Sequence, residues 1–157
     1  MSRNITDGAK PLARGYIFSR PFMGERAPQH VQNIVIRDCC ERNGLSYLLS
    51  ATEYAMPDCH LIMRQVLDEL QSIDAIALYS LFQLPQKAAE REWVYKRVLS
   101  LGKTLYFAVE SLKISSETER ERVEMIWQVR GTLPYCVNDA LEAAPQPFER
   151  VVLRGTT

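Results

Sequence analysis

Short segments with the character of β-strands alternate four times with longer segments of helical periodicity along this sequence. The third strand segment, Asp74–Phe82, is apolar almost throughout, which is typical of a strand in a parallel sheet covered on both faces. Four such alternations predict a three-layer α/β fold: a mostly parallel sheet of four or five strands with helices on both faces. The expected strands are Arg14–Ser19, Leu45–Ala51, Asp74–Phe82 and Thr104–Ser111, and the expected helices cover residues 28–44, 56–73, 85–102 and 115–129.

The length of 157 residues predicts a single domain. Residues 1–13 form a leader, residues 14–111 hold the core, and residues 112–157 supply C-terminal helices and a tail. Within that last part we expect a final helix over 133–144 and a strand or extended tail over 148–155. Hydrophobic and charged contents of 46% and 24% are ordinary for a globular chain and argue against disorder.

The charge balance limits the expected partners. Lys and Arg together number 19, and Asp and Glu together also number 19, so the chain has no net charge. An excess of positive charge that would favour binding to nucleic acid or to an acidic membrane surface is therefore lacking. We therefore expect no nucleic-acid partner and no membrane partner. The N-terminus lacks the apolar centre of a signal peptide, and a cytoplasmic location is the expectation.

The four cysteines indicate neither disulfides nor a metal site. Cys39 and Cys40 are adjacent in a helical pattern, Cys59 and Cys136 stand alone, and no C-x-x-C spacing occurs. Cys59 precedes His60, but neighbours on a helix point about 100° apart and do not face each other. We expect buried or half-buried thiols, no metal and no cofactor.

In open α/β sheets the ligand lies beyond the carboxyl ends of the strands. We therefore expect the functional residues in the segments that follow each strand. The candidates for catalysis are Glu53, His30 and Ser19, and those for substrate binding are Arg20, Arg26, Gln29, Tyr54, Ser80, Gln83 and Glu110.

The loop after the first strand is the candidate anion site. Arg20 and Arg26 flank Gly24 ahead of a helix start, and two guanidiniums near a helix N-terminus suit a phosphate group. Ser19 supplies a hydroxyl at the same place. The alternative is a surface loop with solvated arginines.

Glu53 is the candidate general acid or base, because burial behind an apolar strand would raise its pKa. The alternative is that Glu53 caps the second helix or pairs with an arginine. His30 is a candidate proton shuttle near neutral pH, with a solvated helix histidine as the alternative, and His60 has the same two interpretations.

Amides offer donors and acceptors without charge, which suits sugar hydroxyls; the alternative is ordinary polarity at a helix start. The amides in question are Gln29, Gln32, Gln83 and Gln86.

The strand ending in "YIFSR", the glutamine opening the next helix and the later "SLFQLPQ" resemble the catalytic domain of serine recombinases. The resemblance covers about two thirds of the chain and implies a resolvase/flavodoxin-like fold. With the first strands aligned at Tyr16, the family's arginine falls on Phe18 and its nucleophilic serine on Arg20, one place after Ser19. The acid of the later motif falls on Phe82, and its two arginines on Gln83 and Gln86. A phosphoryl-transfer site without its cations loses its main stabilising term, so we reject recombinase activity.

The blocks "GYIFSRPFMGERAPQHVQN", "YLLSATEYAMPDC", "YSLFQLP" and "FAVESLKI" resemble a small bacterial family of sporadically distributed carbohydrate-biosynthesis clusters. That resemblance implies a role in making or modifying surface polysaccharide and brings no catalytic residue with it.

Two functions follow as hypotheses. The first is an enzyme acting on a phosphorylated or nucleotide-linked sugar, and the second is a non-catalytic resolvase-like module that recruits a partner enzyme. A homodimer is also expected, because the segment Glu117–Gln128 carries Val123, Ile126 and Trp127.

Overall fold

Five strands form one sheet in the order β2-β1-β3-β4-β5. The structure is a computed structural model that describes residues 9–22, 24 and 26–143, with side chains as far as residue 130. The first four strands are mutually parallel, and the fifth pairs antiparallel with the fourth. The strands are β1 (Leu12–Phe18), β2 (Ser46–Glu53), β3 (Ala75–Leu78), β4 (Thr104–Phe107) and β5 (Leu112–Ile114).

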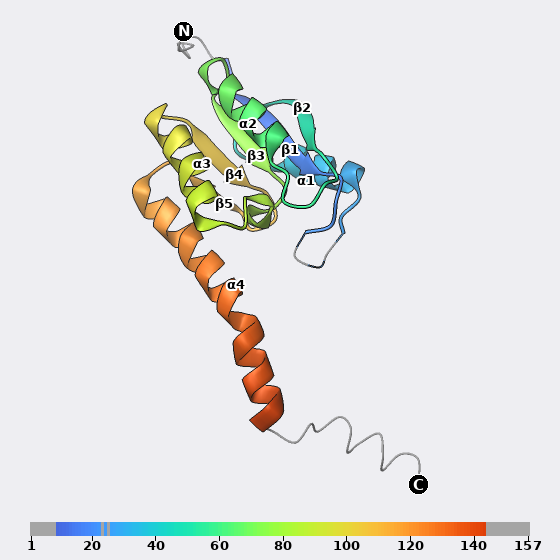
Figure 1. Ribbon diagram of the computed structural model, residues 1–157. Helices are drawn as coiled ribbons and strands as arrows, with labels where there is room; N and C mark the ends of the chain where they lie inside the picture. Colours follow the sequence, from blue (N-terminus) through green and yellow to red (C-terminus); the bar gives the residue numbers. More distant parts are fainter. Residues whose placement is uncertain (1–8, 23, 25, 144–157) are drawn as a thin grey trace. The chain divides into compact units, whose positions relative to one another are not determined.

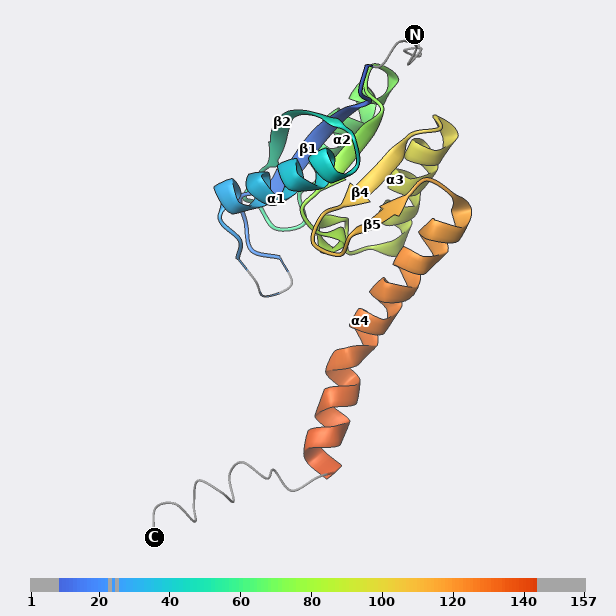
Figure 2. The ribbon, with the colours of Figure 1, turned by 180° about the vertical axis from the view of Figure 1, so that it is seen from behind.

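Helices cover both faces of this sheet (Figures 1 and 2). Helix α1 (Gln29–Arg42) lies on one face, and α2 (Leu61–Asp68) and α3 (Ala88–Ser100) lie on the other. The predicted three-layer α/β fold is therefore confirmed. Helix α1 also ends as predicted, because Gly44 follows it with a φ of 67°, a conformation that favours glycine.

Small residues of β3 let α1 approach the sheet closely. Ala75 and Ala77 pack with Cys39 and Cys40 in one buried cluster beneath α1. Both thiols are almost inaccessible, and Cys59 is half-buried, so these three cysteines match the predicted buried or half-buried thiols. The side chain of Cys136 lies outside the described residues.

Helix α2 begins at Leu61, later than the predicted start near Pro57. Asp58 has a φ of 57°, which no α-helix accommodates, so the chain turns before the helix begins. The turn places His60 at the N-terminal end of α2.

The third strand is shorter than predicted, and the sequence did not predict β5. Ser80 ends β3 by capping the 3₁₀ turn η2 (Leu81–Gln83) with its side chain. After β4, Ser111 adopts a φ of 54° and reverses the chain into β5, a three-residue strand too short for a periodic signal.

One continuous helix, α4 (Glu117–Ala143), replaces the two helices predicted over 115–129 and 133–144. The chain divides into two compact units, residues 1–123 and 124–157. The single domain stays a prediction. The expected strand or tail over 148–155 lies outside the described residues. Among the described helices, none has the length and apolar character needed to cross a bilayer.

Candidate functional site at the carboxyl edge of the sheet

The carboxyl edge of the sheet brings together the segments that follow β1, β2, β3 and β4. Phe18, the last residue of β1, pairs with Glu53, the last residue of β2. Leu78, the last residue of β3, pairs with Phe107, the last residue of β4. The polar side chains of this edge all belong to the first unit.

Glu53 is buried and accepts hydrogen bonds from several groups at once. Its carboxylate accepts from the Tyr16 hydroxyl at 2.8 Å and from the backbone N–H groups of Tyr54, Ile62 and Met63 at 3.1–3.2 Å. The Ile62 and Met63 groups are N–H donors of the first turn of α2, so Glu53 caps this helix. The thiol of Cys59 donates weakly to the same carboxylate.

The expectation that the pKa of Glu53 is raised is wrong, because of these bonds. Burial raises its pKa, but the bond from Tyr16 and the backbone donors lower it further, so the net pKa lies below its ordinary value. A carboxylate whose lone pairs are occupied in this way has little capacity left to take a substrate proton. The geometry therefore matches the capping alternative for Glu53 rather than general acid–base catalysis.

A second carboxylate has a similar place at the other side of the edge. One oxygen of Glu110 accepts from the Ser80 hydroxyl at 2.6 Å and from the Leu81 backbone N–H at 2.9 Å. Ser80 in turn accepts from the Phe82 backbone N–H. Ser80 and Glu110 are therefore engaged in holding η2 after β3.

Two buried glutamines connect β1 to the end of β3. Gln32 donates to the carbonyls of Phe18 and Ala27, and its side-chain oxygen accepts from the Phe18 N–H at 3.0 Å. The same oxygen accepts from the Gln83 amide at 2.8 Å, and Gln83 accepts from the Tyr79 N–H. Both side chains are fully buried, so they do not face a ligand.

Ser19 and Arg20 bind the backbone that follows β2. The Ser19 hydroxyl donates to the Glu53 carbonyl at 2.9 Å, and the Arg20 guanidinium donates to the Tyr54 carbonyl at 2.7 Å. Arg20 also lies 4.2 Å above the ring of Phe18, a cation–π contact.

The remaining sequence candidates lie at the surface and are not brought together with these groups. Arg26, Gln29 and His30 are exposed in the loop and at the start of α1, and the side chain of Tyr54 is 48% exposed. Arg20 therefore contacts other residues of the carboxyl edge, whereas Arg26 is an exposed residue of the loop that follows β1.

The opening that remains at this edge is a cavity of about 220 Å³, which we call the strand-end cavity. It has aromatic walls and a few polar groups, the composition typical of small-molecule sites. The buried side chain of Arg91 donates to the carbonyls of Pro85 and Gln86 and so fixes the rim. The residues that matter for its chemistry are Phe18, Arg20, Phe22, His60, Phe82 and Gln86.

His60 is the titratable group of this cavity that sequence reasoning did not distinguish from His30. Its two ring nitrogens are buried and make no hydrogen bond with the described residues, and the ring packs edge-on against Phe18. Burial and the charge of Arg20 lower its pKa; the Asp58 carbonyl, although outside hydrogen-bonding geometry, opposes this shift. His60 is therefore neutral at pH 7, with one nitrogen able to accept a proton.

His60 also lines a second, smaller cavity of about 190 Å³ between α2 and α3. There the guanidinium of Arg64 lies 5.6 Å from the ring of Trp93, which is 48% exposed. The imidazole thus stands between the strand-end cavity and this aromatic recess.

No cluster of three metal-ligating side chains occurs in the part of the chain that the structure describes. Of the apolar residues that suggested a homodimer, Val123 and Trp127 are buried and Ile126 is half-buried. Two other apolar residues of the same helix, Met125 and Val129, are more than half exposed. The dimer stays a prediction.

Comparison with solved structures finds a similar fold in recombinase catalytic domains. The N-terminal catalytic domain of TP901-1 integrase matches with a TM-score of 0.56 and 15% identity, over 79% of this chain and 98% of that one. A resolvase family site-specific recombinase from Streptococcus pneumoniae matches with a TM-score of 0.55 and 10% identity, over 81% and 97%. At such identities the likeness shows the fold alone, and it confirms the predicted resolvase-like fold. No protein-family model and no curated protein matches the sequence.

The recombinase-like motif of the sequence folds into the wall of the strand-end cavity. Phe82 and Gln86, which replace the acid and one arginine of that motif, line the cavity. Gln83, which replaces the other arginine, is buried in its bond to Gln32. Aromatic and amide groups therefore stand where the serine recombinase motif that the sequence resembles has charged groups.

Proposed function

We propose that this chain is a binding module of bacterial surface-carbohydrate biosynthesis that takes a phosphorylated or nucleotide-linked sugar in the strand-end cavity. One observation carries the proposal: Arg20 and His60 line this cavity, while the buried polar side chains around it bind one another. The guanidinium of Arg20 suits the phosphate, and the aromatic walls suit the face of a sugar ring.

A binding role is favoured over turnover because the candidate catalytic groups are occupied. Glu53 caps α2, the Ser19 hydroxyl donates to the backbone, and His30 is exposed outside the cavity. The link to carbohydrate biosynthesis rests on the sequence blocks that include the loop of Arg20 and the turn before His60.

The first test is a thermal-shift screen with sugar phosphates, nucleotide sugars and free nucleotides. A ligand at about a hundred times its Kd adds about 2.7 kcal/mol to the free energy of unfolding, enough to raise Tm by several degrees. We expect a shift with a phosphorylated sugar that Arg20→Ala abolishes.

Two arginine variants make this test specific. Arg37→Ala removes an exposed guanidinium from α1 and is expected to leave the shift unchanged. Arg26→Ala removes the other arginine that the sequence predicted to bind the anion. Because Arg26 does not line the cavity, this variant is expected to keep the shift. Loss of the shift in Arg26→Ala but not in Arg20→Ala would place the anion in the outer loop and contradict the proposal.

His60 favours a second candidate, an enzyme that moves a proton on the bound sugar. A neutral imidazole in a cavity beside a guanidinium is a suitable general base. In that case His60→Ala abolishes turnover of the ligand found in the screen but changes its Kd by less than about threefold, whereas His30→Ala changes neither.

The pH profile tests the same assignment. The pKa of His60 lies below its ordinary value, so the base form persists to lower pH than for a solvated histidine. Turnover should then be constant at neutral pH and fall on the acid side below about pH 6.5. Turnover that survives His60→Ala with an unchanged profile would remove His60 from the mechanism.

A further inference from the structure

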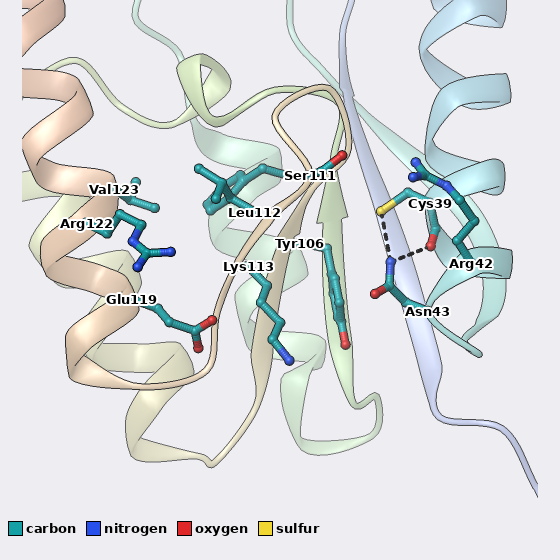
Figure 3. A pocket seen from close by; sticks show the side chains of 11 residues that line it. Cys39, Arg42, Asn43, Tyr106, Ser111, Leu112, Lys113, Glu119, Arg122 and Val123 are labelled. Carbon is teal, nitrogen blue, oxygen red and sulfur yellow. Dashed lines mark hydrogen bonds between the residues drawn. The ribbon is translucent and has the colours of Figure 1, made fainter.

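A third cavity, separate from the strand-end cavity and from the recess between α2 and α3, lies on the face of the sheet that α1 covers only in part. It measures about 450 Å³ and is bordered by the end of α1, by β4 and β5, and by the first turns of α4 (Figure 3). We call it the Tyr106 groove. All of its lining residues belong to the first unit, and none of them lines the strand-end cavity.

The floor of the groove is a tyrosine beside a lysine. Tyr106 of β4 and Lys113 of β5 are direct partners in the antiparallel pair, so both side chains stand on the same face, side by side in Figure 3. Helix α1 packs on β1, β2 and β3, so the Tyr106 ring is only half-buried. A flat aromatic ring in such a position can stack against a planar base.

The walls of the groove carry an excess of positive charge. Lys113 and Arg122 are exposed, and neither forms a salt bridge or a hydrogen bond with another side chain in the described part of the chain. Arg42 pairs with Asp38 at 2.8 Å, but both side chains are more than half exposed, so this pair is weak and can yield to a stronger anion.

The one carboxylate of the groove is already engaged. Glu119 accepts from the backbone N–H of Ser115 at 3.0 Å and also from its hydroxyl, and these bonds hold its pKa below the ordinary value. It neutralises one of the three cations at most, so the groove keeps a net positive charge.

We propose that the Tyr106 groove binds a nucleoside diphosphate, with the base stacked on Tyr106 and the phosphates held by Lys113 and Arg122. The volume falls within the range of small-molecule sites. Lys113 of β5 lies beside the tyrosine, and Arg122 of α4 lies on the opposite wall of the groove (Figure 3). This arrangement suits a ligand that has a planar end and an anionic end. This inference does not depend on the proposed function of the strand-end cavity.

Isothermal titration of the full chain with UDP and ADP at low salt tests the proposal. We expect both to bind, and uridine and inorganic phosphate to bind at least about tenfold more weakly, because each contacts only part of the groove. The double variant Lys113→Ala/Arg122→Ala should weaken the binding of UDP at least about tenfold. Lys87→Ala/Lys96→Ala removes two exposed lysines elsewhere and should leave the affinity unchanged.

The tyrosine is tested by a pair of variants. Tyr106→Leu should weaken the binding of UDP about fivefold or more. Tyr106→Phe keeps the aromatic ring and should bind UDP as the parent does, which shows that substitution at this position does not unfold the protein. No binding of either diphosphate overturns the proposal, as does equal binding of inorganic phosphate or equal loss in the Lys87→Ala/Lys96→Ala control. Loss in Arg20→Ala alone would assign the nucleotide to the strand-end cavity and also overturn it.

Discussion

Replacing Glu53 by glutamine is expected to lower the free energy of unfolding at pH 7 by about 3 kcal/mol, a large share of the stability of a domain this size. Glutamine keeps the shape but replaces one carboxylate oxygen by an amide NH₂. That group would face donors, because the carboxylate of Glu53 accepts from the Tyr16 hydroxyl and the N–H groups of Ile62 and Met63. Urea unfolding followed by circular dichroism measures the loss.

Two further variants calibrate this result. Tyr16→Phe removes a single donor to Glu53 and should cost about 1–2 kcal/mol. Glu41→Gln changes an exposed carboxylate of α1 and should stay within about 0.5 kcal/mol of the parent. If Glu53→Gln kept full stability while removing an activity, Glu53 would be the catalytic residue that the sequence predicted.

The pH dependence of stability follows from the same carboxylate. The folded-state pKa of Glu53 lies below its unfolded value of about 4.3. Its contribution is therefore fully present above the unfolded pKa and is lost as the pH falls through the folded pKa. The difference in stability between the parent and Glu53→Gln should be constant at neutral pH and narrow below about pH 4.

Local sequence signals predicted the alternation of elements and the limits of α1, because the apolar periodicity, Pro28 and Gly44 each act on residues close to them in the sequence. The delayed start of α2 was not predictable in this way. It depends on a left-handed residue, Asp58, and on a cap supplied by Glu53 from the preceding strand.

The contacts within the candidate site were even less predictable from local sequence. Sequence order correctly led to the strand ends, but it could not tell which polar side chains there would bind one another. Gln32 and Gln83 are 51 positions apart, and only the fold brings their amides together. The same holds for His60, which differs from His30 in burial rather than in any property of the local sequence.

Gln32→Leu is expected to lower the free energy of unfolding by about 2–4 kcal/mol, although leucine fills a similar volume. The Gln32 amide accepts from Phe18 N–H and Gln83, and donates to the carbonyls of Phe18 and Ala27. Leucine would leave these groups without a partner at a buried position, and the desolvation cost of each would appear in full. Urea unfolding gives the magnitude, and Gln29→Leu, at an exposed position of the same helix, is the matched control.

A double-mutant cycle with Gln83→Leu distinguishes a structural bond from an amide held ready for a ligand. Because the two side chains bind each other at 2.8 Å, the loss in the double variant should be smaller than the sum of the single losses by about 1 kcal/mol or more. Additive losses would mean that each glutamine acts alone. A single variant as stable as the parent would mean that its amide is free to bind sugar hydroxyls, as the sequence predicted. Coupled losses instead mean that these two amides bind each other and do not bind a ligand. The strand-end cavity is then the place at the carboxyl edge where a ligand can bind.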